Sequence, residues 1–419
     1  MKESLKTFAG DSFFTPGGKL DVSSTEPLTV AFIGGSLTEG EVDYEGTSLS
    51  NPNLKWANVL VGFLSGLFPF RPIKAVNAGL GGTGSQYGAA RFSRNVLSYN
   101  PDLIFIEFSC NDSPMLEEEC NEDGKNDRQI WLESMIRQCM AADKVPAVVY
   151  VHVPVPYEES IMRLFRKGCQ FKQEVLDHYE IGTIDAMADV MHEFETLRSS
   201  DPTWTRERFL SQYYEQYADG TFNVHPFGSG YMLFAMSIIN ALTRDPERYL
   251  RPFKMQPEPY CKAFDREVNL RYSNIPAASD RITYQGNWTL YTSEAPFITD
   301  NPGATINADR YTLPHQFPEG IMQTEMPTGA SFSFETEADR ICMPHISAKA
   351  GLDAKVYANG QPVGVTTCSS PWHGMNYTGP WIDLPKGKKQ IKFEIANATE
   401  DATVFRFGYI IEAFEKDNI

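Results

Sequence analysis

Short apolar runs alternate with longer amphipathic stretches from about residue 28 to residue 245 of the chain. The short runs have the length and composition of buried strands, and in the longer stretches apolar residues recur at helical spacing. This alternation is typical of a mostly parallel sheet that is covered by helices. The predicted strands are 28–33, 74–77, 103–108, 147–153 and 182–185, and the predicted helices are about 53–67, 85–98, 126–143, 158–178 and 228–243.

The pattern changes after about Arg244, where a proline-rich connector leads into sequence with little helical periodicity. Apolar and polar residues then alternate in short runs, which lie at 330–335, 354–358, 390–395 and 404–410. Turn residues such as Asn359-Gly360 separate the runs, and this combination predicts an antiparallel β-sandwich. A chain of 419 residues also exceeds the size at which one core usually keeps growing. We therefore expect two domains, at residues 1–250 and 251–419.

The chain carries 37 basic and 54 acidic residues, so its formal net charge is −17. This excess of negative charge disfavours polyanionic partners, and we expect neither nucleic acid nor a membrane surface as a partner. Residues 1–24 lack the apolar centre of a signal peptide, and residues 57–70 are too few to span a bilayer. The seven cysteines are scattered without a CxxC pair, which is typical of a reduced, cytoplasmic protein with free thiols.

The first predicted strand ends at Gly34-Gly35, and Ser36 follows directly. Because glycine has no Cβ, the chain can turn sharply there and a reacting group can approach the backbone. A serine at the carboxyl end of a strand in an α/β sheet lies where such sheets bind their ligands. Ser36 is therefore a candidate nucleophile, although Gly-Gly-Ser also occurs in many structural turns.

Polar and glycine-rich residues also follow the second and third predicted strands. Residues 77–85 are rich in glycine, Gly82 included, and their backbone amides can face an anion or a developing oxyanion. The alternative there is a flexible turn. Asn111 offers an amide N–H to a substrate oxygen, and Asp112 can anchor the loop by accepting backbone N–H bonds. An ordinary turn or helix cap is the alternative for this pair.

Histidines are scarce, with seven in the chain, and His225 lies in a predicted loop just before a helix. The reference pKa of imidazole lies near neutral pH, so His225 is the candidate general base. His152 belongs to an apolar strand, where ordinary packing accounts for it. The histidines of the last third lack cysteine or carboxylate neighbours at metal-binding spacing, and we expect no metal site.

In their order along the chain, Ser36, Gly82, Asn111 and His225 resemble the four motif residues of the SGNH (GDSL-like) hydrolase family. The resemblance covers roughly residues 25–245, and the ordered set is far more specific than any one motif. It implies a flavodoxin-like α/β/α three-layer domain and a serine esterase that uses no cofactor. In this scheme Ser36 attacks an ester carbonyl and His225 accepts the serine proton. The oxyanion donors are then the backbone amides of Ser36 and Gly82 and the side chain of Asn111.

Two positions depart from the family pattern. Ser109 stands where the third motif commonly starts with Gly, an exchange of one small residue for another that we expect to be harmless, and Phe222 stands where an Asp usually precedes the histidine by three residues. Asp219, six residues before His225, is the candidate third member of the triad, and Glu215 and Asp201 are weaker candidates. A Ser–His dyad oriented by a backbone carbonyl is a further alternative, since the third member holds the tautomer and orientation of the ring.

The last third of the chain is similar to the jelly-roll modules that are attached to carbohydrate esterases. Its segment 369–381 contains side chains that can offer a sugar flat apolar faces and hydrogen bonds, namely Trp372, His373, Tyr377 and Trp381. The alternative is that the aromatic side chains fill the edge of the sandwich. The two-domain arrangement is similar to that of acetylesterases acting on plant oligosaccharides, particularly mannan-type ones.

The leading hypothesis is a cytoplasmic esterase that removes O-acetyl groups from oligosaccharides of plant hemicellulose, without metal or cofactor. One alternative is an esterase of the same family that acts on lipid or thioester acyl groups. The other is a sugar-binding protein with an impaired hydrolase site, which the missing Asp before His225 motivates. The sugar, the acetyl position and the formation of a homo-oligomer stay open.

Overall fold

The structure, a computed structural model, describes residues 7–8, 12–40, 54–112, 127–156, 159–262, 265–292, 317, 319–346, 351–369, 376–397, 399 and 402–415. The chain divides into two compact units, Met1–Val268 and Asn269–Ile419. No helix in these described residues is both long and apolar enough to cross a membrane. The six cysteines that lie in them are all free thiols.

The first unit extends past the expected boundary at residue 250 because the proline-rich connector packs back onto helix α4 (Asp127–Ala141). The backbone N–H groups of Tyr260 and Cys261 donate to the carboxylate of the buried Glu133, at 2.6 and 2.8 Å. Cys261 and Val268 are buried together with Ile130 of the same helix. These contacts place the end of the first unit at residue 268.

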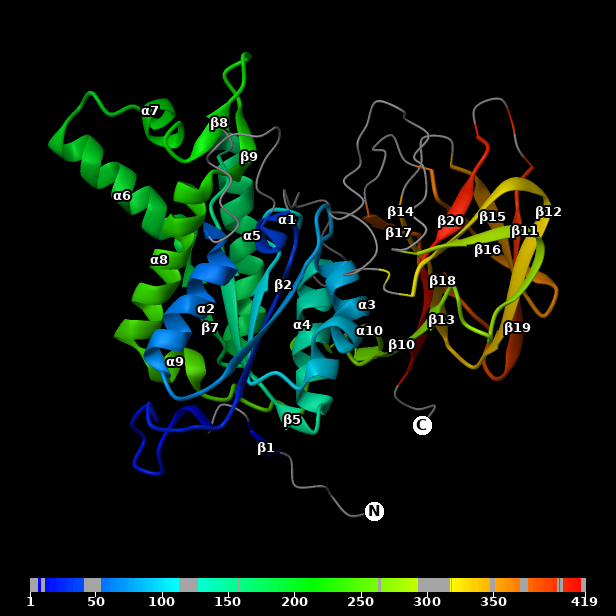
Figure 1. The fold of residues 1–419 in the computed structure, drawn as a ribbon, viewed down its shortest axis with the longest axis horizontal. Coiled ribbons are helices and arrows are strands. Elements are labelled where there is room, and N and C mark those ends of the chain that lie inside the picture. Colours follow the sequence, from blue (N-terminus) through cyan, green and yellow to red (C-terminus); the bar gives the residue numbers. More distant parts are fainter. Residues whose placement is uncertain are drawn as a thin grey trace. The chain divides into compact units, whose positions relative to one another are not determined.

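A five-stranded parallel sheet forms the centre of the first unit (Figure 1). Its strands lie in the order β3-β2-β4-β6-β7, and each neighbouring pair is parallel. Counted along the chain this is the order 2-1-3-4-5 of flavodoxin-like folds, so the predicted fold class is confirmed. The strands are β2 (Leu28–Gly34), β3 (Ile73–Gly79), β4 (Leu103–Glu107), β6 (Ala147–His152) and β7 (Gly182–Asp185).

Two groups of helices cover the sheet (Figure 1). Helix α8 contacts α2, α6 and α9, whereas α4 contacts α3, α5 and α10. The first group is α2 (Trp56–Leu67), α6 (Ala186–Ser200), α8 (Gly228–Arg244) and α9 (Pro246–Leu250). The second group is α3 (Ser85–Asn95), α4, α5 (Glu159–His178) and α10 (Asp265–Val268).

Alternate residues of the central strands face the two helix layers, as the period of a strand requires. Phe32 of β2 and Phe105 of β4 stack with ring centroids 5.4 Å apart, and Trp56 of α2 meets Phe32 edge-on at 5.3 Å. All three side chains are buried in one cluster with residues of α8. The apolar runs of β2, β4 and β6 are buried on both faces, whereas most residues of β3 are partly or fully exposed.

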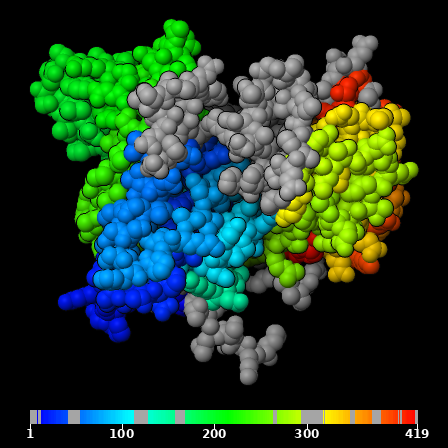
Figure 2. All heavy atoms as spheres, viewed as in Figure 1, coloured from blue at the N-terminus to red at the C-terminus, as the bar shows by residue number. Residues whose placement is uncertain are grey.

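Several elements of the first unit were not predicted, among them the helices α6, α9 and α10. Helix α7 (Arg206–Leu210) leads into a hairpin of β8 (Tyr214–Gln216) and β9 (Phe222–Pro226). Together with α6 these segments belong to the green surface of the first unit in Figure 2. The others are β1 (Thr7–Phe8), which pairs with β5 (Lys144–Val145), the four-residue helix α1 (Ser36–Glu39), and a 3₁₀ turn, Leu97–Tyr99.

The second unit is the predicted antiparallel β-sandwich. One sheet has the order β10-β21-β13-β18, and the other β11-β12-β19-β15-β16, with β20 also paired to β12. The first sheet and the small β14–β17 pair comprise β10 (Arg271–Pro276), β13 (Arg340–Cys342), β14 (Pro344–Ile346), β17 (Asn376–Thr378), β18 (Ile382–Asp383) and β21 (Tyr409–Phe414). The larger sheet comprises β11 (Thr283–Tyr291), β12 (Ile321–Thr336), β15 (Asp353–Ala358), β16 (Gln361–Thr367), β19 (Lys389–Ile395) and β20 (Phe405–Phe407).

The core of the sandwich is aromatic and aliphatic. Phe332 of β12 stacks on Phe393 of β19 and on Phe407 of β20, with both pairs of ring centroids 4.5 Å apart. Asn359 and Gly360 have φ angles of 49° and 79°, so the predicted turn after β15 is the left-handed type that closes two-residue hairpins. The residues that flank Phe332 on β12 and Phe393 on β19 are polar, and they point to the opposite face of the sheet.

Candidate active site

Ser36 and His225, which are 189 positions apart in the sequence, form a direct side-chain contact. His225 Nε2 lies 2.8 Å from Ser36 Oγ. Ser36 is the first residue of α1, separated from the end of β2 by Gly35 alone, and only 6% of it is exposed. A hydroxyl within hydrogen-bond distance of an imidazole is the arrangement that activates a serine as a nucleophile.

The short helix α1 is held by contacts on both sides. Trp56 Nε1 of α2 donates to the Leu37 carbonyl at 3.0 Å, and the amide of Gly40, at φ +76°, donates to the Ser36 carbonyl at 2.9 Å. On the other side, any side chain at Gly34 would overlap Thr38 Oγ1. The helix is therefore fixed although its length gives it little intrinsic stability.

A buried carboxylate is hydrogen-bonded to α1. Glu107, the last residue of β4, accepts a hydrogen bond from Thr38 Oγ1 at 3.0 Å and two from Ser109, from its N–H at 2.8 Å and its Oγ at 2.7 Å. Burial raises the pKa of Glu107, whereas these hydrogen bonds favour its charged form. The carboxylate thus connects α1 to the loop that carries Asn111.

The glycine-rich loop after β3 has a defined conformation. Gly82 has a φ of +72°, in the left-handed region that favours glycine. The amide of Gly81 donates to Glu39 Oε2 at 2.8 Å, and the hydroxyl of Thr83 donates to the Leu80 carbonyl at 2.7 Å. These bonds fix the backbone on both sides of Gly82, so the loop is not a flexible turn.

Asn111 and the glycine-rich loop meet at Gly35. A Cβ on Gly35 would overlap Asn111 Oδ1 and would come within 3.3 Å of the Thr83 carbonyl oxygen. The Asn111 side chain is exposed, whereas Asp112 is buried. Ser36 and Asn111 follow the adjacent strands β2 and β4, where the strand order reverses, which is where doubly wound sheets bind ligands.

Asp112 anchors this arrangement, as expected from the sequence. Its Oδ1 accepts the N–H of Ser85 at 2.7 Å, which ties the Asn111 loop to the start of α3. Its Oδ2 lies 2.8 Å from Nζ of Lys172 of α5, and both side chains are less than 5% exposed. Burial by itself lowers the pKa of Lys172, but the Asp112 carboxylate, with contributions from Tyr150 and Cys169, outweighs it, so the pKa is raised and Lys172 stays charged.

His225 lies in strand β9 of the hairpin, not in a loop as expected, and α8 begins three residues later at Gly228. Its backbone N–H donates to Asn223 Oδ1 at 3.0 Å. The hairpin is attached to the domain by the hydroxyl of Tyr214, which donates to the Pro154 carbonyl at 3.1 Å. Asn223 and Tyr214 were not singled out in the sequence, where only an Asx turn before His225 would have indicated Asn223.

Residues 32–233 match the model of the GDSL-like Lipase/Acylhydrolase family. This part of the chain is similar to that family. The resemblance inferred from the four motif residues is thereby confirmed at the level of the family. A search among curated proteins found no match to the chain.

Solved structures resemble both units of the chain. A two-domain esterase (CEX) active on acetylated mannans, co-crystallised with mannopentaose, superimposes with a TM-score of 0.63 at 19% identity, covering 94% of this chain and 93% of that one. A second structure of a two-domain esterase of that description has a TM-score of 0.62 at 19% identity over the same shares. An acetylxylan esterase from Geobacillus stearothermophilus covers 51% of this chain and 93% of its own at 19% identity, with a TM-score of 0.37. The first two similarities establish the fold, a GDSL-like domain followed by a β-sandwich.

Asp219 of the GDSL-like domain does not occupy the position expected of a third triad member. It lies in the exposed turn of the hairpin, where its Oδ1 accepts the N–H and the hydroxyl of Thr221 at 3.0 and 2.6 Å. These hydrogen bonds lower the pKa of Asp219. The weaker candidates are also engaged elsewhere, because Glu215 accepts from the Asn223 side chain at 3.4 Å and Asp201 accepts the N–H of Thr203 at 3.0 Å.

The other buried histidines of the described residues have packing roles. Burial, with a contribution from Lys172, lowers the pKa of His152 to about 3, and burial lowers that of His345 to about 4, so both rings are neutral. No group of three or more His, Cys, Asp or Glu side chains in the described part of the chain is arranged to hold a metal ion.

The four residues of the β-sandwich that were expected to bind sugar have different outcomes. Trp372 and His373 lie outside the described residues. Tyr377 is in β17, paired with His345 of β14. Trp381 is partly buried, and its ring lies 6.0 Å from that of Tyr272, so it packs on the sandwich.

Proposed function

We propose that this protein is a serine esterase that releases acetyl groups from acetylated carbohydrates. The observation that carries the proposal is the 2.8 Å contact between Ser36 Oγ and His225 Nε2 at the end of β2. The match to the GDSL-like family supports ester hydrolysis as the reaction. Proximity of a base to the hydroxyl supplies the nucleophile that neutral serine lacks.

The reaction proceeds through an acyl-enzyme. His225 Nε2 accepts the Ser36 proton as Oγ bonds to the acetyl carbonyl carbon, and the carbonyl oxygen becomes negatively charged. The backbone N–H groups of Ser36 and Gly82 and the Asn111 amide stabilise that oxygen. His225 then donates the proton to the departing sugar oxygen. A water molecule, deprotonated by the same ring, attacks the acetyl-serine carbonyl carbon. The ring returns that proton to Ser36 Oγ as the acyl C–Oγ bond breaks, and acetate is released.

Mannan-type oligosaccharides are the substrate class that we favour. In support, the esterase of similar two-domain fold is active on acetylated mannans, and the similarity extends over 94% of this chain. The net charge of −17 suits a neutral glycan better than an anionic one.

Acetate release from acetylated mannooligosaccharides tests the proposal. Ser36→Ala and His225→Ala are each expected to lower kcat by roughly 10⁴- to 10⁶-fold, because nucleophile and base act as a unit. A fluorophosphonate should label the parent protein at Ser36 and leave Ser36→Ala unlabelled. Full turnover by Ser36→Ala would rule out the mechanism, and preference for long-chain over short-chain p-nitrophenyl esters would rule out the substrate class.

A further inference from the structure

A groove crosses the outer face of the six-stranded sheet in the second unit. Its volume is about 590 Å³, within the range of roughly 300–1,000 Å³ that is usual for sites of small molecules. All of its lining residues belong to β11, β12, β15, β19 and the turn after β15. The groove is therefore complete within the β-sandwich.

The strand register arranges the lining side chains in two rows. Tyr357 of β15 pairs with Lys392 of β19, Lys392 with Ser333 of β12, and Ser333 with Thr283 of β11. The second row is Glu394, Ser331 and Gln285. Residues two apart on a strand are separated by about 6.6 Å, and neighbouring strands by about 4.8 Å. The rows thus give a regular polar lattice over four strands.

The lattice is rigid because its strands are fixed from the core side. Phe332 and Phe393 alternate with the groove residues and are buried against each other. At one end, the turn residue Asn359 bonds to the backbone of Gln390 twice, each time at 2.9 Å. A ligand would find these side chains already positioned, which lowers the entropic cost of binding.

The chemistry of the groove suits a neutral ligand with many hydroxyl groups. Lys392 and Glu394 are its charged residues, and they pair at 3.3 Å, so their charges largely cancel. The rest of the lining is rich in hydroxyl and amide groups, and the partly exposed ring of Tyr357 adds an aromatic surface. Within the described residues, the side chains of Ser333, Tyr357 and Gln390 form no hydrogen bond, so their polar groups are available to a ligand.

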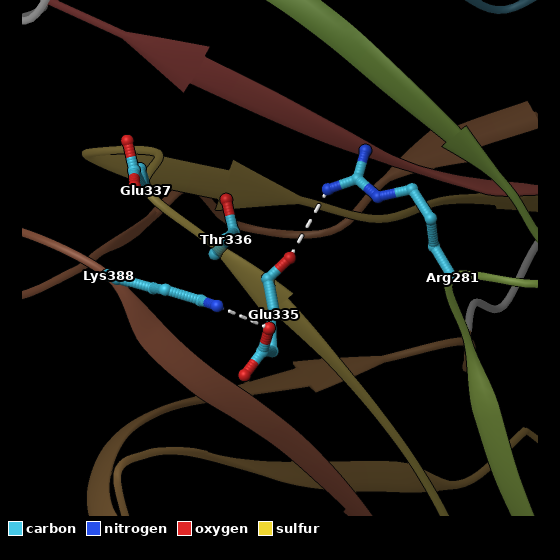
Figure 3. A pocket seen from close by; sticks show the side chains of 5 residues that line it. All are labelled: Arg281, Glu335, Thr336, Glu337 and Lys388. Carbon is cyan, nitrogen blue, oxygen red and sulfur yellow. Dashed lines mark hydrogen bonds and ion pairs between the residues drawn. The ribbon is translucent and has the colours of Figure 1, made fainter.

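A second cavity of the sandwich, of about 390 Å³, differs from this groove in that its lining is mostly charged (Figure 3). Its cations are already engaged: Lys388 Nζ lies 2.7 Å from Glu335 Oε2, and Arg281 bonds both carboxylate oxygens of the buried Glu412 at 3.0 and 3.1 Å. Arg281 also donates to the Glu335 carbonyl at 3.2 Å (Figure 3). This cavity is a set of internal ion pairs, and its residues supply a matched control.

We propose that the groove over β11, β12, β15 and β19 binds a neutral oligosaccharide chain. The sugar hydroxyls bond to the lattice of Ser333, Gln390, Lys392 and Glu394, and the apolar face of one sugar ring stacks on Tyr357. The inference rests on the proposed function, because we take the bound glycan to be the substrate of the esterase. A groove of this kind retains a long substrate on the same chain as the catalytic serine, which raises its local concentration.

Calorimetric titration of the full-length Ser36→Ala protein with mannopentaose tests this inference. Adding Tyr357→Ala and Gln390→Ala is expected to weaken binding at least tenfold, whereas adding Tyr357→Phe, which retains the ring, is expected to preserve most of it. Glu337→Gln in the charged cavity is the control and should bind like the Ser36→Ala protein. Pentagalacturonate, an anionic chain, should bind more weakly than mannopentaose.

The outcomes separate this inference from the proposed function. If the Tyr357→Ala, Gln390→Ala protein binds mannopentaose as tightly as its parent and has the same thermal transition, the groove is not a glycan site. Failure of the parent to bind mannopentaose overturns it as well. If the parent binds through the groove but wild-type protein releases no acetate from any acetylated glycan, the groove stands and the esterase proposal falls.

Discussion

The buried pair Lys172–Asp112 provides a direct test of how the oxyanion donors are held. Lys172→Met removes the cation and leaves the Asp112 carboxylate, which is 4% exposed, without its partner at 2.8 Å. Removing one member of a buried pair leaves an uncompensated charge and costs about 3–5 kcal/mol of stability. We expect the free energy of unfolding, measured in urea, to fall by that amount.

The same substitution should impair catalysis. Asp112 accepts the Ser85 N–H at 2.7 Å and directly follows Asn111, so an Asp112 that relaxes toward solvent displaces the proposed oxyanion donor. Loss of one such donor lowers kcat by about 10²- to 10³-fold. Acetate release from a short acetyl ester, measured at saturating substrate, reports this change separately from binding.

Asp112→Asn in the Lys172→Met background supplies the control. The neutral amide retains an oxygen for the Ser85 N–H while it removes the unpaired charge, so the double variant should be more stable than Lys172→Met. The coupling energy between the two sites should be of the order of 0.5–3 kcal/mol. A Lys172→Met protein with parental kcat and an unfolding free energy within about 1 kcal/mol of the parent would refute the reasoning, since Asp112 would then carry no buried charge that needs a partner.

Three further predictions concern single residues. His152 has a pKa of about 3 in the folded state and about 6.5 when unfolded. Between these values only the unfolded state binds the proton, so unfolding free energy falls by about 1.4 kcal/mol per pH unit below pH 6.5. Urea titrations at pH 6.5 and pH 5 measure this fall. Between these two pH values the unfolding free energy of His152→Gln should decrease by about 2 kcal/mol less than that of the parent protein. Gly35→Ala should lower kcat by about 10²- to 10³-fold, because its Cβ overlaps Asn111 Oδ1; a parental kcat would show that the Asn111 amide does not act. Asp219→Asn should change kcat by no more than about twofold, as is usual for surface substitutions. A loss near 10⁴-fold would return Asp219 to the triad.

The central strands β2, β4 and β6 of the parallel sheet were predictable because they are buried on both faces. Such strands read as continuous apolar runs, and the run Leu28–Gly34 was located to within one residue of its observed end. The contact between Ser36 and His225 was also predictable, although only from the order of four motifs at strand ends. The match of residues 32–233 to the family model shows that the order of these four motifs correctly indicated the family.

The role of Asp219 was mispredicted because closeness in sequence was given more weight than turn chemistry. Asp219 precedes Gly220, which has a φ of +86°, and Thr221, and an Asp before such a glycine commonly accepts the N–H two residues later. The domain boundary was misplaced for a different reason. The connector is fixed by Glu133, more than 120 residues earlier, and no local pattern encodes that contact.

The geometry of the site depends on neighbours rather than on the catalytic contact itself. A hydrogen bond such as that between Ser36 and His225 contributes only about 1 kcal/mol, whereas ordering one residue costs about 1–2 kcal/mol. The contact at 2.8 Å therefore persists because other side chains bond to the backbone beside each reacting group. Trp56 holds the residue after Ser36, Asn223 holds the amide of His225, and Asp112 ties the Asn111 loop to α3. Substitution of these three should consequently reduce kcat by more than the loss of one hydrogen bond implies, since each lost bond releases a segment that the catalytic contact cannot order alone.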